Sequence, residues 1–191
     1  MRTFLSIDLD YFNRHLKSID PFFKQLIRKK CYWSICCEHQ QMLTDILTFG
    51  PDKIINIDAH SDLYYEKEDS NQLGCGNWPK FIPNPEKISW EWRYSKPNLT
   101  NEDRIYLNDK FKEVKTKKGL HGVLDQEIFA IGICCSFSDD YTSEEVLPRI
   151  RPWFEKIQRH DPPICRTGID YSGHLSRCAN CPLEEEEDNG L

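Results

Sequence analysis

The sequence predicts an α/β fold, a three-layer α/β/α sandwich built around a mainly parallel sheet. Short apolar segments alternate with segments in which apolar residues recur at helical spacing, and no internal repeat is present. Polar stretches rich in Asp and His follow three of the apolar segments, as expected where ligands bind at the carboxyl ends of parallel strands. The length of 191 residues suits one domain with a substantial core. We therefore expect a single domain over residues 1–183 and an acidic, disordered tail over residues 184–191.

The first third of the chain predicts three strands and two helices. The strands are expected over residues 3–9, 31–37 and 53–57. A helix is expected within residues 18–30, with Asp20 as its N-cap and Pro21 at its first helical position. A second helix is expected over residues 40–49 and ends at Gly50, because glycine commonly follows the last turn of a helix.

The rest of the chain is less regular. Residues 87–94 place aromatic side chains at every second position and suit a strand, which we expect at an edge of the sheet. Residues 97–122 show no clear pattern, and the basic cluster at 112–118 is expected to be a solvated helix end or loop. A buried strand is predicted over residues 127–136 and a helix over residues 143–158.

Charge and hydropathy argue against two classes of partner. The net charge of -6 and the pI near 5.5 argue against a nucleic-acid surface, because phosphate binding needs concentrated Lys and Arg. No apolar run approaches the ~20 residues of a membrane span, and the N-terminus lacks a signal sequence. We expect a cytoplasmic protein with neither nucleic acid nor membrane as a partner. Two adjacent cysteine pairs, Cys36-Cys37 and Cys134-Cys135, favour reduced thiols over a disulfide framework.

Potential metal ligands follow the first three predicted strands. They are Asp8, Asp10, His39, Asp58, His60 and Asp62. Because the carboxyl ends of parallel strands share one edge of a sheet, these side chains can meet there. Carboxylates with some imidazole and no thiolate favour Mn²⁺, with Fe²⁺, Co²⁺ and catalytic Zn²⁺ as alternatives. Six ligands are too many for one catalytic metal that keeps an open position. Two divalent ions that share carboxylates therefore fit better.

Two of these stretches resemble motifs of the ureohydrolases, the arginase and agmatinase superfamily. Asp58-Ala-His-Ser-Asp62 resembles their DAHxD motif, and Ser6-Ile-Asp-Leu-Asp10 resembles their SxDxD motif. The turn at Glu38-His39 is similar to their GGDH segment, although it lacks the glycines and the Asp. SxDxD comes last in that superfamily and first here, so the motif order is circularly permuted. With the segment Gly76-Asn-Trp-Pro-Lys-Phe81, the chain also resembles a peptide arginase-like family.

The resemblance implies an arginase/deacetylase-like fold and hydrolysis of a linear C–N bond by a hydroxide held between two metals, most simply Mn²⁺. The implied substrate is the guanidino group of an arginine-like or peptidyl-arginine molecule. By resemblance, the ligands of one metal are His39, Asp58, Asp62 and Asp8, and those of the other are Asp58, His60, Asp8 and Asp10. Asp8 and Asp58 would then bridge the metals. His60 and Asp62 are the expected catalytic residues, and Asp62 would carry the proton to the leaving amine.

Other candidate residues lie outside these motifs. Asn77, in a context similar to the family's Gly-Asn segment, is expected to contact the substrate, and Arg166 is expected to hold a substrate carboxylate. The family's histidine proton shuttle and its guanidinium-binding glutamate have no match. Cys178 and Cys181 form a CxxC with His174 just before it, but one such pair falls short of a zinc site, so the use of these residues stays open.

Alternative functions stay open at this point. A deacetylase or other amidase shares the fold that the resemblance implies, and a non-catalytic metal-binding protein could keep the same ligands. The Asp8-Leu-Asp10 segment also resembles the start of haloacid-dehalogenase-type phosphatases, in which the first Asp is the nucleophile and the second an acid. It further resembles the start of lesion-bypass polymerases, which the acidic charge and the short chain disfavour.

Overall fold

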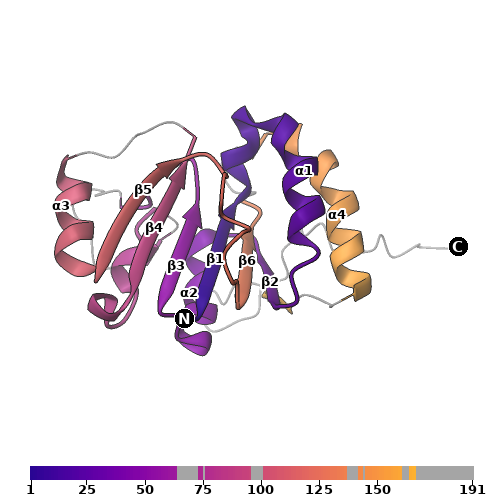
Figure 1. Ribbon diagram of the computed structural model, residues 1–191. Helices are drawn as coiled ribbons and strands as arrows, with labels where there is room; N and C mark the ends of the chain where they lie inside the picture. Colours follow the sequence, from indigo (N-terminus) through magenta and orange to yellow (C-terminus); the bar gives the residue numbers. More distant parts are fainter. Residues whose placement is uncertain are drawn as a thin grey trace, which may run out of the picture.

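The computed structural model shows a parallel sheet with helices on both of its faces (Figure 1). It describes residues 1–63, 73–74, 76–95, 101–136, 142–143, 145–160 and 164–166, without the side chains of 101–103, 158–160 and 164–166. Within these residues the sheet has seven strands in the order β5-β4-β3-β1-β6-β2-β7, and every pair of neighbours is parallel. The predicted α/β fold with its three layers is confirmed.

The elements follow one another in a mostly alternating order. The strands are β1 (Thr3–Asp8), β2 (Tyr32–Cys36), β3 (Lys53–Ile57), β4 (Ser89–Tyr94), β5 (Glu113–Lys118), β6 (Ala130–Cys134) and β7 (Ile164–Arg166). The α-helices are α1 (Leu16–Leu26), α2 (Met42–Phe49), α3 (Asn101–Lys110) and α4 (Val146–His160). Short 3₁₀ helices are η1 (Leu9–Arg14), η2 (His39–Gln41), η3 (Trp78–Phe81) and η4 (Pro85–Lys87). The strands predicted at 3–9, 31–37, 53–57 and 127–136 therefore form, as does the helix that ends at Gly50.

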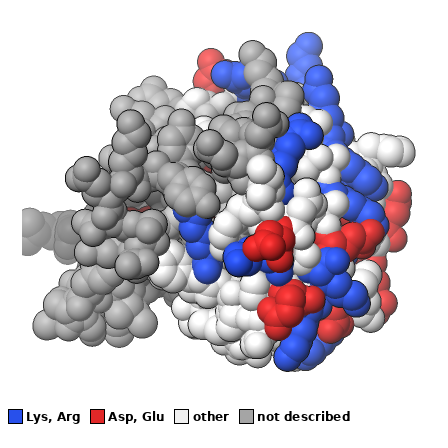
Figure 2. Space-filling model, turned by 90° about the vertical axis from the view of Figure 1, so that its left-hand side faces the viewer, with Lys and Arg blue, Asp and Glu red and all other residues white. Residues whose placement is uncertain are grey.

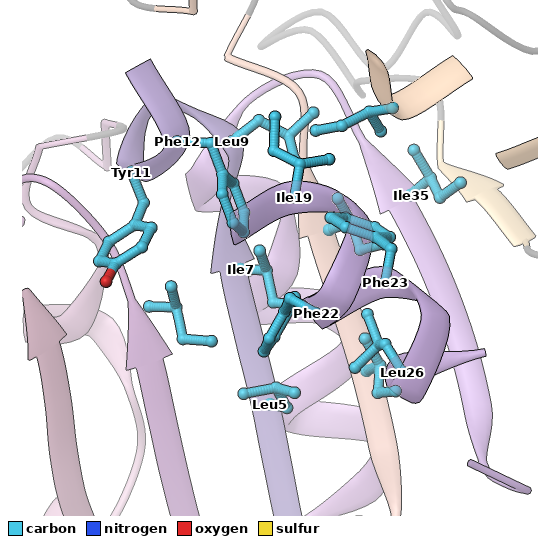
Figure 3. Close-up of a cluster of buried hydrophobic side chains, with 14 of the residues drawn as sticks. Leu5, Ile7, Leu9, Tyr11, Phe12, Ile19, Phe22, Phe23, Leu26 and Ile35 are labelled. Atoms are coloured by element: carbon cyan, nitrogen blue, oxygen red, sulfur yellow. The ribbon is translucent and has the colours of Figure 1, made fainter. Parts of the chain in front are cut away.

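One face of the sheet carries a core made by odd-numbered strand residues. Leu5 and Ile7 of β1 belong to this core together with side chains of α1 and α4. Figure 3 shows Phe22 of α1 lying over the strand beside Leu5 and Ile7, with Leu26 farther across the sheet. Because strand side chains alternate between the two faces, the even-numbered residues of β1 and β3 must point to the opposite layer.

The opposite layer is packed by α2, α3 and aromatic strand residues. Phe4, Ile54 and Trp90 are buried there with Met42 of α2 and Leu107 of α3. Ser6 and Asn56, also even-numbered, are fully buried on the same side, which is an expensive place for polar groups unless they have partners. Their partners belong to the candidate site.

Gly132 of β6 leaves room for the side chains of Phe4 and Met42, which belong to the layer on the α2 side of the sheet. A Cβ atom at this position would lie 2.9 Å from Cζ of Phe4 and 3.1 Å from Sδ of Met42. A larger residue would therefore push Met42 away from the sheet.

The predicted start of α1 is wrong. The helix begins at Leu16, so that Pro21 lies inside it instead of at its first position. Asp20 is not the N-cap, since its Oδ1 accepts a hydrogen bond from Nε1 of Trp153 in α4, at 2.9 Å. Packing of the helix on the sheet and on α4 outweighs the single backbone hydrogen bond that Pro21 removes. The helix predicted at 143–158 also begins later than expected, at Val146.

The strands at one side of the sheet differ from the prediction. β4 is an interior strand, because β5 pairs with it along all six residues from Glu113 to Lys118. The basic cluster at 112–118 is thus largely an edge strand and not a helix end or loop. Charged side chains on an edge strand hinder pairing with another chain. Figure 2 looks onto this side of the molecule and shows Lys and Arg mixed with Asp and Glu, as in the pair of Lys115 and Glu113 at 2.9 Å.

A buried charge network fastens β4 to its neighbours. Glu91, which is 2% exposed, accepts hydrogen bonds from Lys53 of β3 at 2.5 Å and from Nε of Arg93 at 2.6 Å. Arg93 also donates to the carbonyl oxygen of His121 at 2.8 Å, and Lys53 donates to Oε1 of Gln126 at 2.7 Å. Each buried charge therefore has an opposite charge and further hydrogen-bond partners, the condition under which such groups are tolerated in a core.

The cysteines are described in part. Cys31, Cys36, Cys134 and Cys135 are free thiols. Cys37 is disulfide-bonded, so the expectation of reduced thiols is wrong at this position. His174, Cys178, Cys181 and the acidic tail lie outside the described residues. Among the described helices, none has the length and apolarity needed to cross a bilayer.

Candidate metal centre

The carboxyl ends of β1 and β3 place two carboxylates next to each other. The two strands are parallel neighbours with Ile7 in register with Ile57, so Asp8 and Asp58 are the next residues on both. Both are even-numbered and lie on the α2 side of the sheet. Asp58 is fully buried and Asp8 is 5% exposed, so bulk water does not solvate the negative charge of either carboxylate.

His39 reaches the same place from the turn between β2 and α2. Its side chain is 1% exposed, and Nδ1 lies 2.7 Å from Oδ2 of Asp62, 3.1 Å from Oδ2 of Asp58 and 3.3 Å from Oδ2 of Asp8. None of these contacts has hydrogen-bond geometry, so Nδ1 is a buried polar atom without a hydrogen bond. A ring nitrogen that faces three carboxylate oxygens without bonding to any of them suits a site for a cation in their midst.

The other nitrogen of His39 fixes which tautomer is available. Oγ of Ser6 lies 2.7 Å from Nε2 of His39 and donates its hydrogen to Sδ of Met42 at 3.0 Å. A serine hydroxyl has one hydrogen, so its oxygen accepts from Nε2–H when the hydrogen points to Met42. In neutral His39 the lone pair is then on Nδ1, the atom that faces the carboxylates.

A second group lies on the solvent side of Asp58. Nδ1 of His60 is 2.7 Å from Oδ2 of Asp10 and 4.0 Å from Oδ1 of Asp58. Backbone hydrogen bonds shape the loop, because Asp58 accepts from the His60 N–H at 2.7 Å and Asp10 accepts from the Ala59 N–H at 3.2 Å. The side chain of His60 is 45% exposed, so this end of the cluster is open to small molecules.

Asp58 belongs to both groups. Ligand atoms of Asp8, His39 and Asp58 lie within 4.8 Å of one another, and so do those of Asp10, Asp58 and His60. Oδ2 of Asp58 faces His39, while its Oδ1 faces His60. These buried Asp and His residues could hold a metal ion.

The pKa values show how unfavourable the cluster is without a cation. Burial and the neighbouring carboxylates of Asp8 and Asp58 raise the pKa of Asp10 to about 7, although His60 opposes this rise. Burial and Asp62 raise the pKa of Asp58 well above its ordinary value. In the metal-free chain, protons on these carboxyl groups supply part of the neutralisation that a metal would provide.

The pKa values of the two histidines are also raised. Burial alone would lower the pKa of His39, but the carboxylates of Asp62, Asp58 and Asp8 outweigh it and raise the pKa well above 6.5. The hydrogen bond to Asp10 raises the pKa of His60 to about 9. The raised pKa values favour the imidazolium form of both rings in the absence of metal, and each ring must lose one of its two N–H protons to become a ligand.

Supporting contacts come from residues that the sequence did not single out. Nε1 of Trp78 donates to Oδ2 of Asp62 at 2.5 Å, and the hydroxyl of Ser136 lies 2.8 and 2.7 Å from the two oxygens of Asp8. Ser136 follows the carboxyl end of β6, so the strand-end rule that found the ligands would have found this residue as well. Trp78 carried no such signal, because an aromatic residue in a short 3₁₀ helix is most often part of the core.

The structure brings the six predicted ligands together. The two predicted substrate contacts are Asn77 and Arg166. Oδ1 of Asn77 accepts a hydrogen bond from the N–H of Gly74 at 2.7 Å, so this atom holds the turn that precedes η3. Arg166 lies in β7 in register with Cys36, near the same edge of the sheet, and its side chain is outside the described residues. Substrate contact by both residues remains a prediction.

Comparison of the chain with protein-family models, with curated proteins and with solved structures finds no match in any of the three.

Proposed function

We propose that this chain is a dinuclear metal-dependent hydrolase that cleaves a linear C–N bond. The proposed metal is Mn²⁺, and the proposed substrate class is the guanidino group of an arginine-like or peptidyl-arginine molecule. One observation carries the proposal: Asp58 belongs to two groups of ligands and turns one carboxylate oxygen toward each. A shared carboxylate of this kind is what two adjacent metal ions require.

The residues present fit such ions in charge and in ligand type. Carboxylate and imidazole donors suit Mn²⁺, and several carboxylates crowded in a buried site need positive charge. His39, Asp8, Asp58 and Asp62 would hold one ion, and Asp58, His60, Asp8 and Asp10 the other. When bound, two divalent ions supply a hydroxide nucleophile at neutral pH, because they lower the pKa of water.

The chain's own residues then have separate tasks. His60 lies at the exposed end of the cluster, where a substrate would arrive, and its hydrogen bond to Asp10 orients its ring. Oδ2 of Asp62 is held by Nε1 of Trp78 and lies against His39. The proposal assigns proton transfer to the leaving amine to the other oxygen of Asp62.

The substrate class rests on the resemblance to the ureohydrolase motifs. The segments that resemble SxDxD and DAHxD lie at the carboxyl ends of β1 and β3, which are neighbours in the sheet. Permuting the order of two adjacent parallel strands along the chain leaves their carboxyl ends side by side. The permuted order is therefore compatible with a shared site.

One observation disfavours the phosphatase alternative. A nucleophilic Asp at position 8 would need a carboxylate oxygen open to the substrate, but Asp8 is 5% exposed and both of its oxygens lie within hydrogen-bonding distance of the Ser136 hydroxyl. A deacetylase or a non-catalytic metal-binding protein would have the same cluster, so the experiment has to separate these from a guanidino hydrolase.

The test is hydrolysis by purified protein that has been stripped with a chelator and reconstituted with Mn²⁺. Urea release is measured from arginine, agmatine and arginine-containing peptides, and acetate release from acetyl-lysine peptides. We expect Mn²⁺-dependent urea release from one of the guanidino compounds, its loss in His39→Gln, and its retention in the exposed control His121→Gln. Acetate release alone would support a deacetylase, and stoichiometric Mn²⁺ without hydrolysis would support a binding protein. Phosphatase activity that needs Mg²⁺ and survives His39→Gln would support the dehalogenase interpretation.

A further inference from the structure

Ser136 lies in the second position after β6, beside Asp8. The strand places it there, because Cys134 of β6 is in register with Asp8 of β1. Its side chain lies in the buried part of the site, with the residue 9% exposed. The proposed function assigns Ser136 no task in metal binding.

The backbone of Ser136 has an unusual conformation. Its φ is 46°, in the left-handed region that disfavours residues with a Cβ atom and where glycine is the default. A serine kept in such a conformation at a site is reason to ask what its side chain does there.

The hydroxyl of Ser136 contacts both oxygens of Asp8. Oγ lies 2.8 Å from Oδ1 and 2.7 Å from Oδ2. Oδ1 also accepts a hydrogen bond from the N–H of Asp10 at 3.1 Å, and Oδ2 faces Nδ1 of His39 at 3.3 Å. The plane of the carboxylate is therefore fixed from one side by Ser136 and Asp10, with Oδ2 directed at His39.

A buried thiol also lies beside the hydroxyl. Sγ of Cys134 is 3.2 Å from Oγ of Ser136, and either atom can be the donor in this contact. The thiol has an acceptor of its own, because Sγ donates to the carbonyl oxygen of Cys37 at 3.6 Å. The single hydrogen of the hydroxyl is therefore available to the carboxylate of Asp8.

We propose that Ser136 is a positioning residue for the metal centre, which holds Asp8 so that Oδ2 is presented to the ion shared with His39. The inference rests on the proposed metal centre and adds to it a residue that follows a fourth strand. With a cation bound near Oδ2, the hydroxyl of Ser136 would donate to Oδ1 and so hold one orientation of the carboxylate. Partners of this kind orient ligands in metalloproteins, and their loss typically weakens metal binding about 10–100-fold.

The test compares Ser136→Gly with Ser136→Ala. Both remove the hydroxyl, but glycine accepts the left-handed backbone and alanine does not, so the pair separates hydrogen bonding from conformation. Mn²⁺ affinity is measured by competition with a chelator, and thermal unfolding of the metal-free protein is measured in parallel. Ser34→Ala, a buried serine of β2, is the matched control.

We expect both Ser136 variants to bind Mn²⁺ about 10–100-fold more weakly than the wild type and the Ser34→Ala control. Metal-free Ser136→Gly should unfold within about 2–4 °C of the wild type, because the conformation of residue 136 is retained and only the hydrogen bonding to Asp8 is lost. Wild-type affinity in Ser136→Gly, with weak binding in Ser136→Ala alone, would overturn the inference and assign the effect to the backbone. No Mn²⁺ binding by the wild type would overturn the metal centre itself, and the inference with it.

Discussion

Asp58→Asn should abolish metal binding while leaving the metal-free fold intact. Asp58 is the residue shared by both ligand groups, so its replacement removes one donor from each. Asparagine has nearly the same shape but no charge. The pKa of Asp58 lies well above its ordinary value because of burial and Asp62, so the metal-free chain already favours a neutral side chain at this position.

The size of the effect follows from linkage between binding and folding. A metal present at 100 times its dissociation constant stabilises the native state by about 2.7 kcal/mol. In a chain of this length 1 kcal/mol corresponds to about 2–4 °C in the unfolding midpoint, so Mn²⁺ should raise the midpoint of the wild type by roughly 5–10 °C. For Asp58→Asn we expect a shift below about 1 °C on the same basis, because both ligand groups are broken.

The assay is thermal unfolding with and without Mn²⁺, together with metal analysis of the dialysed protein. Asp125→Asn changes an exposed carboxylate away from the cluster and serves as the control that should keep the full shift. A metal-dependent shift of wild-type size in Asp58→Asn would refute the bridging argument. A metal-free Asp58→Asn that unfolds several degrees below the metal-free wild type would refute the claim that a neutral residue is favoured there.

Three further predictions concern pH, an indole donor and a close-packed glycine. Metal affinity should rise as the pH rises through about 7, because Asp10, with its pKa raised to about 7, must lose its proton to bind. Metal-free stability should change in the opposite direction, because a raised folded pKa stabilises the protonated form. The contribution of Asp10 is lost as the pH rises from 3.8 to about 7, and that of His60 as the pH rises from 6.5 to about 9. Chelator competition at pH 6 and 8 tests the predicted rise in metal affinity. Denaturation of the metal-free protein from pH 5 to 9.5 tests the predicted loss of stability, and a stability that does not change with pH would contradict it. Trp78→Phe removes the donor to Asp62 and keeps an aromatic ring, so it should weaken Mn²⁺ binding about 10-fold and lower the free energy of unfolding by about 1 kcal/mol. Unchanged affinity in a Mn²⁺ titration would show that the indole is only part of the core. Gly132→Ala should lower the free energy of unfolding, measured in urea, by about 1–3 kcal/mol, because the added carbon would lie 2.9 Å from the side chain of Phe4. An unchanged urea midpoint would mean that Phe4 can move aside without cost.

The fold could be predicted because its strands are short, apolar and bounded by polar turns. β1, β3 and β6 are continuous buried segments, and such segments separated by helical patterns indicate a parallel sheet. The convergence of ligands could be predicted for a related reason. Parallel strands all end at the same edge, so Asp8 and Asp58 could be brought together without knowledge of the strand order.

Predictions from short sequence patterns were wrong where contacts between distant residues determine the structure. Asp20 followed by Pro21 has the pattern of a helix start, yet the carboxylate bonds to Trp153, which is 133 residues away in the sequence. The alternating charges of β5 suggest a solvated segment, but they are also typical of an edge strand, and sequence alone did not separate the two. Ser136 is 128 residues from Asp8, so no local pattern connects them, and only the rule that polar residues after parallel strands converge would have pointed to it.

The strict alternation of side chains along β1 and β3 has a consequence for how this chain can change. Ser6, Asp8, Asn56 and Asp58 share one parity, and the neighbouring odd-numbered residues fill the core under α1. A single inserted or deleted residue within either strand would turn its carboxylate into the apolar layer and an isoleucine into the cluster. A shift in the register of either strand would therefore remove core side chains and metal ligands together. Insertions and deletions are expected only in the connections between strands.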